Sequence, residues 1–149
     1  MFLTKKTIII GSDHGGLALK AHLVTSLTKE GLHVIDAGTH NADSVDYPDY
    51  GAKVAKAVAS GEFEAGIIIC GTGIGISIAA NRFKGVRAAL CHNINFAKLS
   101  REHNNANILA LSGRFSTPQE ADVIVHTWLN TEFEGGRHQG RIDKLDTLN

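Results

Sequence analysis

The chain lacks the features that would place it outside the ordinary globular proteins. It has only two cysteines among 149 residues, and no apolar run approaches the roughly 18 residues that span a bilayer. Fifteen basic residues are balanced by fifteen acidic ones, so no basic excess is available to attract nucleic acid or a membrane surface. These absences exclude a disulfide scaffold, a membrane-spanning protein and a general nucleic-acid binder.

Further motifs are also missing. Cys70 and Cys91 do not form a CxxC pair, which indicates reduced thiols and a cytoplasmic protein. The eight histidines show no H-x-x-x-H or H-x-H spacing on a common element, so no metal site is predicted. No G-x-S-x-G elbow of a serine hydrolase is present. Residues 1–6 run straight into a strand-like segment without the apolar core of a signal peptide.

Strand-like and helix-like segments alternate along the chain. The predicted strands cover residues 6–12, 32–36, 65–70, 86–90 and 107–111, and the predicted helices cover residues 17–29, 48–60, 74–83, 93–101 and 117–129. The strands are short, apolar and rich in β-branched residues, as in a parallel sheet covered on both faces. The sequence therefore predicts one doubly wound α/β domain of about five parallel strands, in which ligands bind at the carboxyl strand ends.

The last nineteen residues depart from this alternation. Residues 134–141 are polar and rich in glycine, and a short helix over 141–148 can follow them. Composition alone leaves two interpretations open, a disordered end or a C-terminal extension over residues 131–149.

The segment after the third predicted strand is the most informative. Cys70 ends the apolar run, and glycines at 71, 73 and 75 lead into a helix. Their backbone N–H groups can converge on an anion, and a helix N-terminus favours the thiolate of the cysteine. The pattern matches neither a dinucleotide-binding fingerprint nor a Walker P-loop. A base or nucleophile beside an anion cradle is the functional interpretation.

Other candidates have structural alternatives. Asp13 and His14 follow the first strand, where Asp13 also suits a helix cap and His14 a solvated position. His103 lies near a helix end built from asparagines, where a C-cap is the alternative. Arg137 and Arg141 are spaced to share one face and hold a phosphate, or are simply solvated. Tyr47 begins the second helix, where packing is the alternative.

Five stretches, spread from the first predicted strand to the tail, carry a resemblance. They are Gly11–Gly16, Asp46–Pro48, Ile69–Asn81, Leu99–Asn104 and Glu134–His138. Together they closely resemble type B ribose-5-phosphate isomerases, the group that includes galactose-6-phosphate isomerases. The resemblance implies a Rossmann-like homodimer or dimer of dimers whose C-terminal extension packs on the partner subunit. It also implies interconversion of ribose 5-phosphate and ribulose 5-phosphate without metal or organic cofactor.

The resemblance further implies roles for individual residues. Cys70 is expected to be the base that moves a proton between C2 and C1, with Thr72 orienting the sugar or the thiol. His103 of the partner subunit is expected to open the sugar ring. One branch of the family has a glutamate base where this chain has Ile74, which favours the cysteine base. The expected substrate contacts are Asp13, His14, Tyr47, Gly71, Gly73, Ile74, Gly75, Asn104, Arg114, Arg137, His138 and Arg141, with the phosphate against His14, Arg137 and Arg141.

Three alternatives remain at this point. A six-carbon substrate such as allose 6-phosphate fits the same motifs, whereas galactose-6-phosphate isomerases depart from the Cys-Gly-Thr-Gly pattern. A phosphosugar- or nucleotide-binding domain without catalysis is possible on the same fold. Redox sensing through a Cys70–Cys91 bridge is the third.

Overall fold

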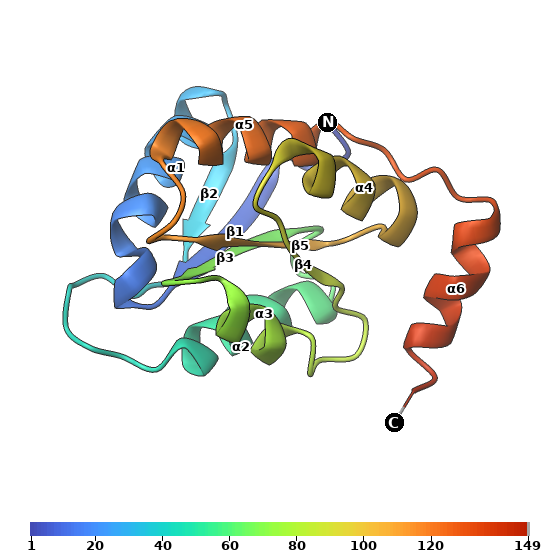
Figure 1. Cartoon of the computed structure of the whole chain (residues 1–149), viewed down its shortest axis with the longest axis horizontal. Coiled ribbons are helices and arrows are strands. Elements are labelled where there is room, and N and C mark those ends of the chain that lie inside the picture. The colour runs from blue at the N-terminus through green and yellow to red at the C-terminus, as the bar shows by residue number, and fades with distance from the viewer. Residues whose placement is uncertain (149) are drawn as a thin grey trace.

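Five parallel strands form one sheet in the order β2-β1-β3-β5-β4 (Figure 1). The strands are β1 (Thr7–Ser12), β2 (His33–Asp36), β3 (Gly66–Cys70), β4 (Ala88–Leu90) and β5 (Ile108–Ser112). The computed structural model describes residues 1–148. Strands β3 and β5 are fully buried, because helices cover both faces of the sheet. The prediction of a doubly wound α/β fold with about five parallel strands is confirmed.

Helices form a layer on each face of the sheet (Figure 1). One layer holds α1 (Leu17–Lys29), α4 (Ile94–Asn104) and α5 (Pro118–Leu129), and the other holds α2 (Tyr47–Ala59) and α3 (Ile74–Ala80). Each layer packs on its own apolar cluster: Leu23 and Trp128 belong to the first, and Val54 and Ile76 to the second. Among the described residues, no helix is both long and apolar enough to cross a membrane.

Two helix ends within the α/β body differ from prediction by three residues. Helix α3 ends at Ala80, three residues early, because the side chain of Asn81 bonds both the N–H and the C=O of Ala88 at 2.8 and 2.9 Å. Helix α4 continues three residues past the predicted end, to Asn104, and stops at Asn105, whose φ of 46° is left-handed. This longer helix places His103 and Asn104 inside its last turn.

The tail forms helix α6 (Arg137–Leu145), which begins four residues before the predicted start. The backbone N–H of Glu134 donates to the C=O of Glu102 at 3.1 Å and so ties the preceding linker to α4. Only His138 and Ile142 of α6 are buried, and the helix lies beside the three-layered body, below the end of α4 (Figure 1). The chain thus ends in a helix with a small internal contact area.

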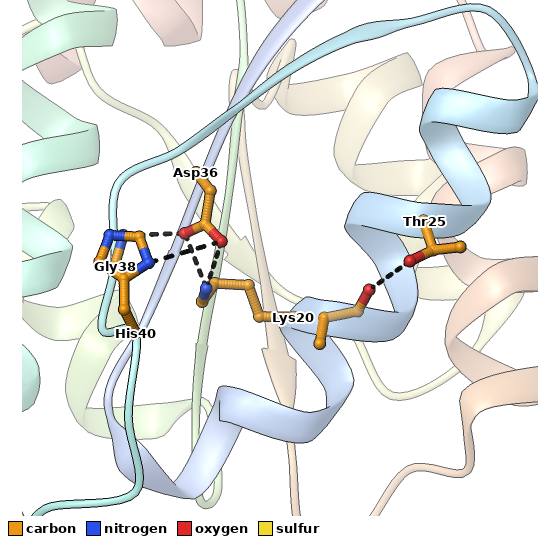
Figure 2. Close-up of polar contacts among 6 residues, drawn as sticks. Lys20, Thr25, Asp36, Gly38 and His40 are labelled. Atoms are coloured by element: carbon orange, nitrogen blue, oxygen red, sulfur yellow. Dashed lines mark hydrogen bonds and ion pairs between the residues drawn. The ribbon is translucent and has the colours of Figure 1, made fainter.

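An ion pair between the buried Lys20 and the partly exposed Asp36 fixes the start of the loop after β2. Lys20 of α1 is 2% exposed, and its Nζ lies 2.6 and 2.7 Å from the two carboxylate oxygens of Asp36. The N–H of Gly38 donates to the same carboxylate at 2.9 Å, and Nδ1 of His40 lies 3.9 Å from its Oδ2 (Figure 2). The pair therefore sets the direction of the loop that leads to Tyr47, the first residue of α2.

Candidate active site

Strand order reverses between β1 and β3, because β2 lies on one side of β1 and β3 on the other. In open α/β sheets, ligands bind at the carboxyl ends of the strands beside such a reversal. Asp13 follows β1, Cys70 ends β3, and the N–H of Asp13 donates to the C=O of Ile69 at 3.2 Å. Two of the sequence-predicted segments therefore meet at this point.

The loop after β5 completes this edge. The N–H of Gly113 donates to the C=O of Cys70 at 2.8 Å, and that of Arg114 to the C=O of Gly71 at 3.0 Å. A Cβ atom on Gly113 would lie 2.3 Å from the carbonyl oxygen of Gly15, so the three loops pack backbone against backbone. Only glycine permits that approach, and the resulting loop framework has little freedom.

Cys70 is 4% exposed, and its Sγ accepts a hydrogen bond from the N–H of Gly73 at 3.2 Å. Gly73 has a φ of +78°, which turns its N–H back toward the sulfur. A thiolate accepts such a bond more strongly than a thiol, since charge strengthens the acceptor. The N–H of Ile74 donates to Thr72 Oγ1 at 3.2 Å. The N–H groups of Gly73 and Ile74, both expected to bind an anion, therefore donate hydrogen bonds within the loop instead.

Two polar side chains approach this loop from other elements. A Cβ atom on Gly75 would lie 2.6 Å from Cζ of Tyr47, so the phenol ring covers that glycine. A Cβ atom on Gly71 would lie 3.2 Å from Cζ of Arg114, so the guanidinium group lies against the loop as well. A phenol and a fixed positive charge are therefore available to a ligand here.

Asp13 and His14 make definite local contacts. Oδ1 of Asp13 accepts from the N–H groups of Gly15 and Gly16 at 2.9 and 3.2 Å, so the capping role is observed. Nδ1 of His14 accepts from the N–H of Val45 at 3.1 Å. A neutral His14 then holds its proton on Nε2, a donor suited to a phosphate oxygen. We call Asp13, His14, Tyr47, residues 70–75 and Arg114 the loop site.

The remaining predicted residues gather elsewhere. His103 and Asn104 at the end of α4 and His138 and Arg141 on α6 line a pocket of about 250 Å³. The rings of His103 and His138 stack with centroids 4.3 Å apart and planes 13° apart. We call these four residues the histidine cluster, beside which Arg137 begins α6.

The histidine cluster is electrostatically positive. Burial lowers the pKa of His138, and the positive charges of His103, Arg137 and Arg141 lower it further. The carboxylate of Glu134, 3.5 Å from Nε2 of His138, raises the pKa of His138 and so partly offsets this lowering. An uncharged His138 between two arginines leaves the cluster suited to an anion.

The loop site and the histidine cluster lie at opposite edges of the sheet. Cys70 pairs with Ser112 at the carboxyl ends of β3 and β5, whereas Gly66 pairs with Ile108 at their amino ends. His103 lies in the last turn of α4, which leads into the amino end of β5, so it lies at the amino edge, roughly 13 Å away along the strands at 3.3 Å per residue. One chain therefore does not bring Cys70 and His103 together.

The two cysteines differ in their surroundings. Cys91 packs in the apolar cluster under α1, α4 and α5, whereas Cys70 belongs to the cluster on the other face. Burial raises the pKa of the Cys91 thiol to about 11. A Cys70–Cys91 bridge would have to cross the sheet, so the redox interpretation loses its geometric basis.

Sequence reasoning missed two residues. Ser112 is fully buried, and its hydroxyl donates to the C=O of Gly71 at 2.7 Å and accepts from the N–H of Phe115 at 3.0 Å. It joins two loops of the loop site, and its place at the end of β5 was the available signal. Glu134 belongs to a stretch that carries the family resemblance, but the sequence did not predict it as a site residue. In the structure it lies with His103 and His138 as a group of possible metal ligands. Their separation along the chain hid that grouping.

Comparison with known proteins identifies the family. The family described as Ribose/Galactose Isomerase matches residues 8–145. Ribose-5-phosphate isomerase B of Escherichia coli is 48% identical over 143 residues, 96% of each chain. The structure of a Clostridium thermocellum ribose-5-phosphate isomerase B has a TM-score of 0.93 at 57% identity, covering 95% of each chain. A Mycoplasma genitalium ribose-5-phosphate isomerase B with bound ribulose-5-phosphate has a TM-score of 0.91 at 46% identity, covering 95% of this chain and 94% of its own.

These matches extend over nearly the whole chain, including the loop site, α4 and α6. The sequence identities, between 46% and 57%, are too high for a likeness of fold alone. The chain therefore belongs to the ribose/galactose isomerase family and, within it, to the type B ribose-5-phosphate isomerases.

Proposed function

We propose that this protein interconverts D-ribose 5-phosphate and D-ribulose 5-phosphate, with Cys70 as the base. The single observation that supports this most is the contact between the Gly73 N–H and Cys70 Sγ, 3.2 Å long, at the strand-order reversal. It holds a thiol among N–H donors at the place where α/β sheets bind ligands. A simple phosphate binder has no need for such a thiol.

The proposed reaction moves two protons, one between carbons and one between oxygens. The Cys70 thiolate removes the proton on C2 of the open-chain aldose, and the electron pair of that bond forms a cis-enediolate. The proton then returns to C1, and the hydroxyl proton moves from O2 to O1, which gives the ketose. Backbone amides of residues 71–75 would stabilise the enediolate oxygen, with those of Gly73 and Ile74 exchanging their present acceptors, Cys70 Sγ and Thr72 Oγ1, for it. A preorganised donor of this kind is worth roughly 3 kcal/mol. Thr72 and Tyr47 would orient the sugar.

We propose that the complete site combines two chains. The loop site of one protomer would face the histidine cluster of its partner in a homodimer or a dimer of dimers. The separation of Cys70 from His103 by the length of the strands supports this arrangement, as does the small contact between α6 and its own body. His103 of the partner would open the sugar ring by acid–base transfer, and Asn104 beside it would bind sugar hydroxyls.

The phosphate would lie between the two chains. His14 supplies an Nε2 donor from the loop site, and Arg137 and Arg141 supply guanidinium groups from the partner's α6. Arginine binds phosphate with two parallel hydrogen bonds, which suits two arginines on adjacent turns of one helix. Arg114 and His138 are additional phosphate ligands in this proposal.

An assay of ribose 5-phosphate conversion, with and without a chelator, tests the proposal. Chelator-resistant conversion is the expected result, whereas tight nucleotide binding without conversion would favour a binding domain. Comparing kcat/KM for ribose 5-phosphate and allose 6-phosphate separates five-carbon from six-carbon specificity. The two free cysteines, both buried, support a reducing, cytoplasmic location.

A further inference from the structure

We infer a binding site for a divalent transition metal, best suited to Zn²⁺, formed by His103, Glu134 and His138. The three residues come from the end of α4, from the linker and from α6. Each offers one ligand atom, and these atoms all lie within 4.8 Å of one another. Two imidazole nitrogens with one carboxylate oxygen are a donor set typical of zinc sites that keep one position open.

The ligand atoms need to move only slightly. Tetrahedral coordination with bonds of about 2.1 Å separates ligand atoms by roughly 3.4 Å. Nε2 of His138 and Oε2 of Glu134 are already 3.5 Å apart. His103 can complete the triangle by a small rotation that ends the ring stacking.

The backbone around the three ligands is already tied together. The N–H of Glu134 donates to the C=O of Glu102, the residue before His103, at 3.1 Å. The N–H of His138 donates to the C=O of Gly135 at 3.1 Å, which fixes the turn between Glu134 and α6. The linker is thus held at the end of α4 before any ligand binds, so ordering it adds little cost to metal binding.

Two neighbouring arginines affect both the affinity of the site for a metal and the choice of a further ligand. Arg137 and Arg141 on α6 oppose a bare cation, so the inferred affinity is below that of a structural zinc site. The same arginines favour an anion in the open coordination position. A metal on the nitrogen of His103 also removes that group from proton transfer. Zinc is therefore expected to inhibit the isomerase, a consequence that rests on the proposed function, whereas metal binding does not.

Calorimetric titration of the full-length protein with Zn²⁺ alone, without sugar, tests the site. We expect one Zn²⁺ per chain, and at least about tenfold weaker binding in Glu134→Gln. Glu134 is exposed, so folding is preserved. Glu132→Gln, the same charge change two residues away, is the matched control and should bind as the wild type does. Equal affinity in Glu134→Gln and the wild type would overturn the inference.

Two further measurements exclude other sources of the signal. Cys70→Ser should keep zinc binding, and loss of binding there with retention in Glu134→Gln would assign the metal to the thiol and refute the site. Inhibition of sugar conversion should need at least about tenfold more zinc in Glu134→Gln than in the wild type. A protein that binds zinc as expected yet never converts ribose 5-phosphate would refute the proposed function and leave the metal site standing.

Discussion

The loop site consists of backbone contacts between neighbouring strand ends, whereas the histidine cluster consists of side chains from separate segments. In the loop site, three loops bond through their N–H and C=O groups, and Gly113 packs directly on Gly15. In the histidine cluster, His103 meets His138 through ring stacking alone, across 35 residues of chain. The first region is fixed by the fold itself, and the second depends on how the tail docks.

The difference has a chemical counterpart. A base that must reach one carbon and donors that must reach one oxygen need a rigid frame, because small displacements are costly in rate. In the proposed mechanism, the ring-opening histidine and the phosphate-binding arginines tolerate more movement, since the arginine side chains are long. Placing the arginines on α6, beside His103 at the end of α4, also makes this set available to another chain. The comparison can be tested by disabling each region separately.

The largest expected effect is at Cys70. Cys70→Ala should lower kcat by about 10²–10⁴, the usual contribution of a general base, while substrate still binds. Steady-state kinetics and calorimetry of substrate binding measure the two quantities. Cys91→Ala is the matched control: its thiol lies in the opposite core and its pKa of about 11 keeps it protonated, so kcat should not change. An active Cys70→Ala would contradict the thiol base.

Mixing two inactive variants tests whether the regions belong to one composite site. Cys70→Ala and His103→Ala should each be nearly inactive alone. After subunit exchange, half of the dimers would contain one of each chain, and each such dimer has one intact site. Activity should then recover to about a quarter of the wild-type value. A mixture that stays inactive, with mixed dimers verified by mass spectrometry, would place both residues in the same chain's site.

A smaller effect is expected on α6. Arg141→Ala should raise KM about tenfold or more with little change in kcat, because a phosphate contact is made equally in ground and transition states. Lys144→Ala, an exposed residue on the same helix, is the control and should leave KM unchanged. An unchanged KM in Arg141→Ala would remove the phosphate role from the histidine cluster.

The smallest effect concerns Glu64 and the segment before β1, which belong to neither region. Glu64 accepts hydrogen bonds from Thr4 and from the N–H of Lys5, and the Thr4 bond in particular lowers the pKa of this carboxyl. Its contribution is present above its ordinary pKa of 4.5 and is lost as pH falls through the lowered value. Glu64→Gln should therefore lower the free energy of unfolding by about 0.5 kcal/mol at pH 7, since water screens this surface carboxylate, and by less at pH 3.

Denaturant unfolding at the two pH values measures this effect, with Glu62→Gln, an exposed neighbour, as the control. Neither variant should change kcat. A change in kcat for Glu64→Gln would mean that the segment before β1 influences the loop site, and the two-region comparison would then need revision.

The loop site was predictable from sequence because its parts are local. Cys70 and its glycines are contiguous, and parallel strands bring successive carboxyl ends to one edge. The tail was less predictable, since its polar, glycine-rich composition does not encode a helix start at Arg137. The grouping of Glu134 with His103 was also not predictable, because it depends on how the tail docks. A hydrogen bond from the backbone N–H of Glu134 to the C=O of Glu102 holds the two segments together. Ser112 looked like an ordinary strand end and showed its role only in the fold.

The backbone packing at Gly113 bears on how this enzyme can be redesigned. A Cβ atom added to Gly113 would lie 2.3 Å from the carbonyl oxygen of Gly15, so the loop framework leaves no room for a side chain at this position. We expect libraries for longer phosphosugars to succeed at positions 104, 138 and 141, where side chains can be exchanged without moving a strand. The catalytic edge would remain constant while the docked tail sets the length of the accepted sugar.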